Sequence, residues 1–74
     1  MTQFKIQTVR QGHMVLVSGH SEVAQIRNDG RGWEATRTEG PRGPSMKWIG
    51  EPVRVSHLVN QPDGAEQIAV ALGL

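Results

Sequence analysis

Apolar and polar side chains alternate along the first part of the chain. In residues 4–10, Phe4 and Ile6 fall on one side and polar residues on the other, which is the two-residue period of a β-strand. The Gln-Gly pair at 11–12 predicts a tight turn. The Val- and Leu-rich residues 13–18 then predict a second strand, covered on part of both faces.

Residues 22–28 fit two different structures. Ser21 is a suitable N-cap for a short helix there. The Asn-Asp-Gly sequence at 28–30 is, however, a strong turn signal, and an alternating segment restarts at Trp33. We therefore expect residues 22–28 to form a strand that enters a hairpin. In the next strand, Trp33 and Arg37 would share one face.

The third quarter of the chain contains a loop followed by two short apolar segments. Residues 40–45, Gly-Pro-Arg-Gly-Pro-Ser, predict an exposed and mobile loop with Arg42 at its centre. Residues 46–49 resume an apolar segment. The Gly-Glu-Pro sequence at 50–52 predicts a bend or an end there, and residues 53–58 are then expected to form the final strand.

The last segment is typical of an amphipathic helix over residues 63–72. Pro62 suits the first helical turn, with Gln61 or Asn60 before it as the cap. One helical face would carry the apolar residues Ala65, Ile68, Ala69 and Leu72. The chain is therefore predicted to be α+β, with an antiparallel sheet of four to five strands and one C-terminal helix packed on one face.

Composition limits how this fold is stabilised and where it is expected to act. The 74 residues, taken as a single domain over 1–74, contain no Cys, and only 36% are hydrophobic. A core this lean, together with an N-terminal edge strand, is compatible with a homodimer. There is no apolar run long enough for a membrane span and no signal-peptide pattern, so we expect a cytoplasmic protein.

The sequence offers no convincing catalytic or metal-binding group. His13, His20 and His57 share no known ligand spacing. Ser56 precedes His57 directly, and neighbours on a strand point to opposite faces, so they would not form a nucleophile–base pair. We expect a protein that is not an enzyme and needs no metal or cofactor.

Basic and aromatic residues gather in the middle of the chain. This cluster is the candidate binding region and comprises Arg27, Arg31, Trp33, Arg37, Arg42, Lys47, Trp48 and Arg54. Arg and Trp side by side can grip phosphates and stack on bases, and the same residue types dominate protein-interface hot spots. Alternatively, the two tryptophans fill the core. The overall charge of only +1 argues against a non-specific DNA binder.

From Val23 onward, the order of elements resembles the three-strand-plus-helix plan of AP2-type and integrase-arm DNA-binding domains. The resemblance rests on residues 32–37 (Gly-Trp-Glu-Ala-Thr-Arg), 48–50 (Trp-Ile-Gly) and 64–69 (Gly-Ala-Glu-Gln-Ile-Ala). It implies a sheet that enters the major groove, with Arg37 and Arg54 towards bases and Arg31 and Lys47 towards phosphates. The chain departs from that family in its low net charge and its two additional N-terminal strands.

In size and composition the chain also resembles small inhibitors encoded by phages and mobile elements, including anti-CRISPR proteins. The likeness lies in a short, Cys-free, near-neutral chain with a plain sheet and one helix. It implies a protein that covers a functional surface of a host assembly, one that handles nucleic acid, for example. Our leading hypothesis is such an inhibitor or adaptor, and the alternative is a sheet-based DNA-binding domain.

Overall fold

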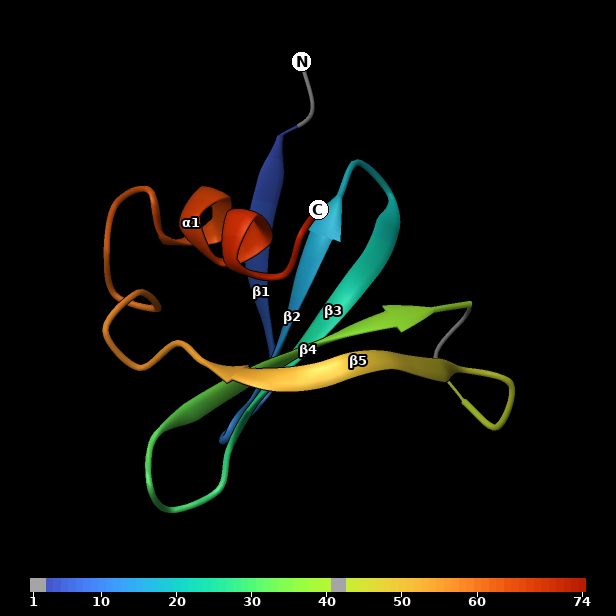
Figure 1. The fold of residues 1–74 in the computed structure, drawn as a ribbon, viewed down its shortest axis with the longest axis horizontal. Coiled ribbons are helices and arrows are strands. Elements are labelled where there is room, and N and C mark those ends of the chain that lie inside the picture. The colour runs from blue at the N-terminus through green and yellow to red at the C-terminus, as the bar shows by residue number, and fades with distance from the viewer. Residues whose placement is uncertain (1–2, 41–42) are drawn as a thin grey trace.

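A computed structural model describes residues 3–40 and 43–74 and confirms the predicted α+β fold class. Figure 1 shows an antiparallel sheet with a short helix over one of its faces. The elements are β1 (Phe4–Arg10), β2 (His13–Ser18), β3 (Ser21–Asn28), β4 (Trp33–Glu39), β5 (Lys47–Arg54) and α1 (Gly64–Ala71).

The five strands follow one another across the sheet in chain order, each antiparallel to its neighbour. Short turns at Gly12 and Gly19, both with positive φ, connect the first three strands. Residues 22–28 form part of β3, which confirms the strand prediction over the helical alternative. The meander leaves β1 and β5 as the two edges of the sheet.

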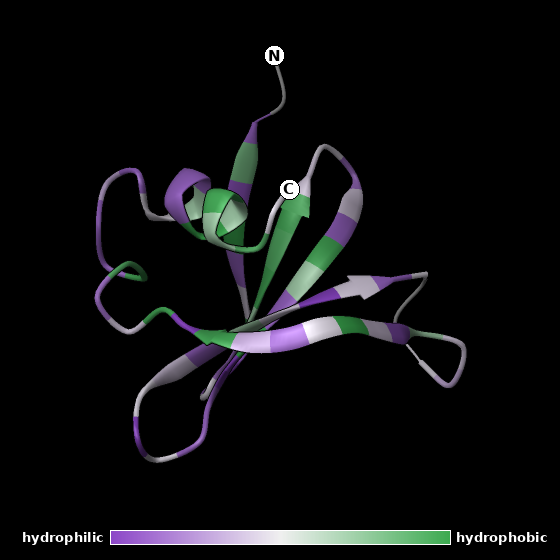
Figure 2. Cartoon of the chain, viewed as in Figure 1, coloured by the Kyte–Doolittle hydropathy of each residue, from purple (hydrophilic) through white to green (hydrophobic). Residues whose placement is uncertain are grey.

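The core lies between the sheet and α1. Leu16, Ile26 and Ala35 have no exposed surface, and they face Ile68 and Ala69 of the helix. Figure 2 shows apolar segments of the strands behind the helix. The predicted apolar face of the helix is confirmed, because three of its four residues are among the most buried in the protein. No helix in the described part of the chain is long and apolar enough to cross a membrane.

Strand β5 corrects the prediction of two separate segments at 46–49 and 53–58. It is one strand from Lys47 to Arg54, and Gly50-Glu51-Pro52 lies within it. The register shifts between Ala35 and Arg37 of β4, so that the extra residues of β5 bulge out of the ladder. Gly50 has a φ of 76°, and Pro52 is tolerated because β5 is an edge strand.

The chain leaves the sheet after Arg54, which corrects the predicted strand over 53–58. The buried Val55 still donates its N–H to the Trp33 carbonyl at 2.9 Å, but its own carbonyl accepts from Leu58 and Val59 in a turn. The helix also begins later than the predicted first turn at Pro62. Asp63 occupies the N-cap position, without a side-chain cap hydrogen bond, in place of the predicted Gln61 or Asn60.

Candidate functional site

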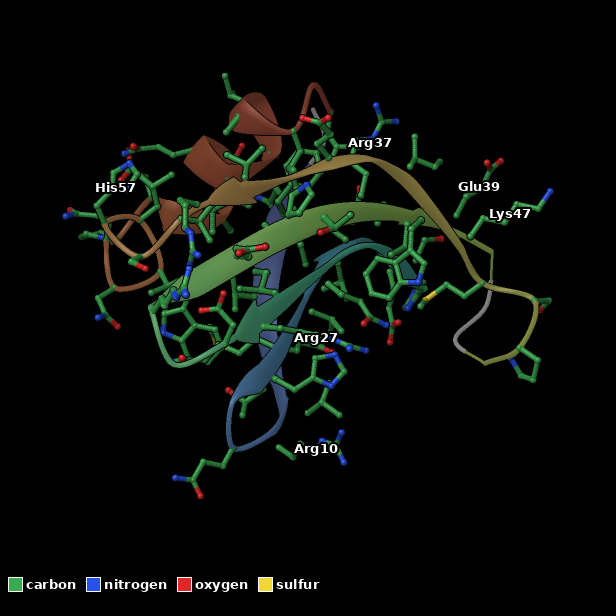
Figure 3. The ribbon with its side chains drawn as sticks, turned by 60° about the horizontal axis from the view of Figure 1, so that its bottom comes forward. Arg10, Arg27, Arg37, Glu39, Lys47 and His57 are labelled. Carbon is green, nitrogen blue, oxygen red and sulfur yellow. The ribbon has the colours of Figure 1, made fainter. Side chains whose placement is uncertain are left out.

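The sheet has two unlike faces, and the predicted basic and aromatic cluster is divided between them. Cross-strand partners share a face, so the register places Trp33, Arg37 and Lys47 on the same face as the helix. Arg27, Trp48 and Arg54 lie on the opposite face, which we call the open face. In Figure 3, Arg37 and Arg27 accordingly lie on opposite sides of the sheet.

Two members of the cluster lie outside both faces. Arg31 is exposed in the turn between β3 and β4, where its backbone N–H donates to the Asp29 carboxylate at 2.9 Å. Arg42, expected at the centre of a mobile loop, lies outside the described residues. The open face is therefore the place where the structure joins an exposed aromatic side chain to basic ones.

Trp48 is the exposed aromatic residue of the open face. It is 49% exposed, and the Arg27 guanidinium lies 5.2 Å from the centre of its ring, within range of a cation–π interaction. The alternative of a core position is wrong for Trp48. It holds for Trp33, which is partly buried and packs against the core. A half-exposed Trp is the kind of side chain that dominates binding energy in interfaces.

Arg27 is oriented by a buried neighbour on the same strand. Its guanidinium donates to the Gln25 side-chain carbonyl at 3.0 Å, and Gln25, only 2% exposed, donates its amide to the Met46 sulfur at 3.2 Å. Gln25 therefore fixes Arg27 over Trp48 and also connects β3 to the residue before β5. This arrangement holds two exposed side chains in place before any partner binds.

The register also aligns one polar side chain from every strand in a single row across the open face. Successive antiparallel partners run from β1 to β5 without a break. We call this set the cross-strand row, and it consists of Arg10, His13, Arg27, Glu34 and Arg54. Figure 3 shows Arg10 and Arg27 projecting from the same side of the sheet. The row gives the open face a defined charge pattern.

Ion pairs occupy one end of the cross-strand row. The Arg54 guanidinium lies 3.2 Å from Asp29 and 3.1 Å from Glu34, so two carboxylates compensate its charge. Both of its terminal nitrogens donate to Asp29, at 3.2 Å each. This bidentate contact ties the turn between β3 and β4 to the end of β5. Arg54 is thus paired with Asp29 and Glu34 within the folded chain.

The same cluster lowers the pKa of Asp29. The hydrogen bond from the Arg31 backbone N–H contributes most and that from Arg54 comes next, and together they bring the pKa from its ordinary value of 3.8 to about 2. The pKa of Arg54 is raised, chiefly by its hydrogen bond to Asp29. Asp29 therefore remains a carboxylate throughout the physiological pH range.

Arg37 and Lys47 lie on the helix-bearing face. The Arg37 guanidinium is close to the C-terminal end of α1, since a Cβ at Gly73 would lie 4.0 Å from it. A positive charge there complements the helix dipole, and α1 carries no basic residue in its last turn. Lys47 is opposite Glu39 in the register, and Figure 3 shows the two projecting together. Arg37 and Lys47 thus lie on the face of the sheet opposite to Trp48.

The predicted binding residues did not include several residues of the open face, among them Arg10, Gln25 and Met46. Arg10 was detectable in principle, because the two-residue turn at 11–12 sets it opposite His13. Gln25 and Met46 gave no signal, because their contact depends on how the chain returns after the loop at 40–45. The cross-strand row depends on the register of all five strands, which shifts at three places in the sheet.

Other parts of the described surface differ from the open face in the groups that they bring together. Among the described residues, no three His, Cys, Asp or Glu side chains gather into a group able to hold a metal ion. A shallow, mostly apolar depression of about 360 Å³ lies on the outside of α1, between residues 57–58 and the helix. Val70, which is 76% exposed, borders it. The depression lacks the combination of aromatic, basic and hydrogen-bonded groups found on the open face.

Comparison of the chain with protein-family models, with curated proteins and with solved structures found no match.

Proposed function

We propose that this chain is a small binding protein that docks on a protein partner through the open face of its sheet. The observation that carries the proposal is Trp48, 49% exposed yet held by Arg27 and, through Arg27, by Gln25. An exposed apolar ring has a hydration cost that a partner would relieve. The proposal includes no catalytic step.

The biological role that fits this proposal best is an inhibitor or adaptor of a host protein assembly. Support comes from the small single sheet, which exposes Trp48 on one face. The helix packs its apolar face into the core. The sequence resemblance to small phage and mobile-element inhibitors points the same way. In this role the protein acts by covering a surface of its partner.

Direct DNA binding through the sheet has less support from the geometry. The AP2-like arrangement needs Arg37 and Arg54 to face the same groove, and here they lie on opposite faces of the sheet. Arg54 is also paired with two carboxylates, which would repel a phosphate backbone. Among the described residues, the arginines of the open face without a carboxylate partner are Arg10 and Arg27.

The proposal is tested by affinity capture from a lysate of the source cells, with the wild-type chain and two variants compared by quantitative mass spectrometry. Trp48→Ala removes the anchor, and Val70→Ser removes an exposed apolar side chain from the outside of α1. We expect one set of partner proteins to be retained by the Val70 variant and lost by the Trp48 variant. Retention of the same partners by Trp48→Ala would overturn the proposal.

A further inference from the structure

The cross-strand row is electrostatically uneven, and this unevenness identifies the chemistry of a partner. At the β4–β5 end, Asp29 and Glu34 compensate Arg54. At the β1–β3 end, Arg10 and Arg27 form no ion pair with any described residue. The open face therefore has a positive half and a half in which two carboxylates face one guanidinium, although the whole chain carries a net charge of only +1.

Arg27 retains most of its capacity to donate hydrogen bonds. A guanidinium carries five N–H donors, and the contact with Gln25 uses one terminal nitrogen. Because Gln25 and the Trp48 ring fix the plane of the guanidinium, less side-chain entropy is lost when an anion binds. A fixed guanidinium with free donors is suited to a carboxylate, which it binds through two parallel hydrogen bonds.

We propose that the positive half of the row, Arg10 and Arg27 with Trp48 beside them, binds an acidic polypeptide segment of the partner. This inference rests on the proposed docking function and names the partner chemistry of the same face. Carboxylates of the segment bind the two arginines, and an apolar side chain covers the exposed part of Trp48. The carboxylates at Asp29 and Glu34 limit how far an acidic segment extends across the row.

Two observations favour a polypeptide over nucleic acid at this face. A phosphate backbone that followed the row would meet Glu34 and Asp29 within two strands of Arg27. In addition, Arg27 occupies one side of the Trp48 ring, which leaves less of the ring for a stacked base. A nucleic-acid backbone carries only negative charges. A polypeptide can carry charges of both signs and can therefore match a row of mixed sign.

The test uses the full-length protein, labelled with ¹⁵N, and two probes of equal charge: a ten-residue glutamate peptide with one central leucine, and a thymidine oligonucleotide. Titrations are followed by the NMR signals of the Trp48 indole N–H and the arginine Nε–H groups. We expect the acidic peptide to shift the signals of Trp48, Arg27 and Arg10. These shifts should diminish as salt is added.

Variants assign the binding to the row. Arg27→Gln should weaken peptide binding about tenfold, as expected for the loss of a charge-assisted hydrogen-bonded pair. The peptide affinity of Arg27→Lys should lie between that of Arg27→Gln and that of the wild type, because lysine keeps the charge but loses the paired donors. Arg31→Gln is the matched control, since Arg31 is also exposed but lies in the turn outside the row, and it should bind like the wild type.

Several outcomes would overturn the inference. Shifts centred on Arg31 or Lys47, or peptide binding that Arg27→Gln leaves unchanged, would show that the row is not the site. Tighter binding of the oligonucleotide at Arg27 would assign the face to nucleic acid. If Trp48→Ala abolishes capture of a partner but the acidic peptide fails to bind, docking stands and only the acidic partner is wrong. If the Trp48 variant keeps its partners, both proposals fail.

Discussion

The guanidinium of Arg27 lies 5.2 Å from the centre of the Trp48 ring, on the face of the sheet that the helix leaves uncovered. The two residues come from β3 and β5, so β4 lies between them. Their contact holds a large aromatic side chain in a fixed position while half of it remains in solvent. The proposed binding function depends on that contact.

The two tryptophans should differ sharply in their contribution to stability. Trp48→Ala removes an exposed ring and one cation–π contact, so the free energy of unfolding should fall by about 1 kcal/mol or less. Trp33→Ala removes a ring that packs against the core, and the loss should be about 2 kcal/mol or more. Urea denaturation followed by circular dichroism measures both. Equal losses would contradict the assignment of Trp48 to the surface.

Asp29 should contribute to stability at neutral pH and lose that contribution in acid. Its pKa in the folded chain is about 2, below the ordinary value of 3.8, so the folded state binds the proton less readily than the unfolded state. The contribution is therefore complete above 3.8 and disappears as the pH falls through about 2. In denaturation at a series of pH values, Asp29→Asn should lose less stability over this interval than the wild type.

A control variant and an NMR titration test the cause of the low Asp29 pKa. Asp63→Asn, at an N-cap that makes no side-chain cap hydrogen bond, should follow the wild-type pH profile more closely. An NMR titration of the Asp29 carboxyl carbon in Arg54→Gln should still give a pKa below 3.8, because the Arg31 N–H is the largest cause of the shift. A return to the ordinary value in that variant would assign the effect to Arg54 instead.

Gly64 should not tolerate a side chain. It is buried at the start of α1, and a Cβ there would meet the backbone carbonyl of Leu58, which cannot move as a flexible side chain can. Gly64→Ala should therefore lower the free energy of unfolding by about 2 kcal/mol, although alanine favours helix formation. Gly43→Ala meets no atom within 4 Å but has a φ of 132°, so in the same denaturation experiment it shows the cost of backbone strain without a steric clash. A stabilised Gly64 variant would contradict the close approach.

Thr38 should be replaceable by valine with a gain in stability. It is 7% exposed, opposite Trp48 on the open face, and its hydroxyl has no hydrogen-bond partner among the described residues. An apolar side chain of the same shape removes the cost of burying that group, so Thr38→Val should raise the free energy of unfolding by about 1 kcal/mol. Thr36→Val, at a less buried position on the same face, should change it little. A destabilised Thr38 variant would indicate a hydrogen bond to the hydroxyl.

Much of the fold was predictable because its signals are local. The alternation in residues 4–10 and the glycine turns after it gave the first strands, and the spacing of Ile68, Ala69 and Leu72 gave the helix. Strand β5 was divided in error because Gly50 and Pro52 normally end a strand. Here a bulge on an edge strand accommodates both, and that depends on the pairing with β4.

The candidate site was predictable only in part. The sequence showed that Arg and Trp are concentrated between Arg27 and Arg54, but one shift in register moves a side chain to the other face. The division of Arg27 and Arg37 between two faces therefore had to come from the structure. The same holds for Arg10, which is far from the cluster in sequence and joins Arg27 through β2.

The central claim, that the open face around Trp48 contacts a partner, is tested most directly by site-specific photocrosslinking in the source cells. A photoreactive phenylalanine analogue is placed at position 48 in one variant and at position 70, on the outside of α1, in another. The account predicts a defined covalent adduct with a partner protein from position 48 and none from position 70. An adduct from position 70 alone would contradict it.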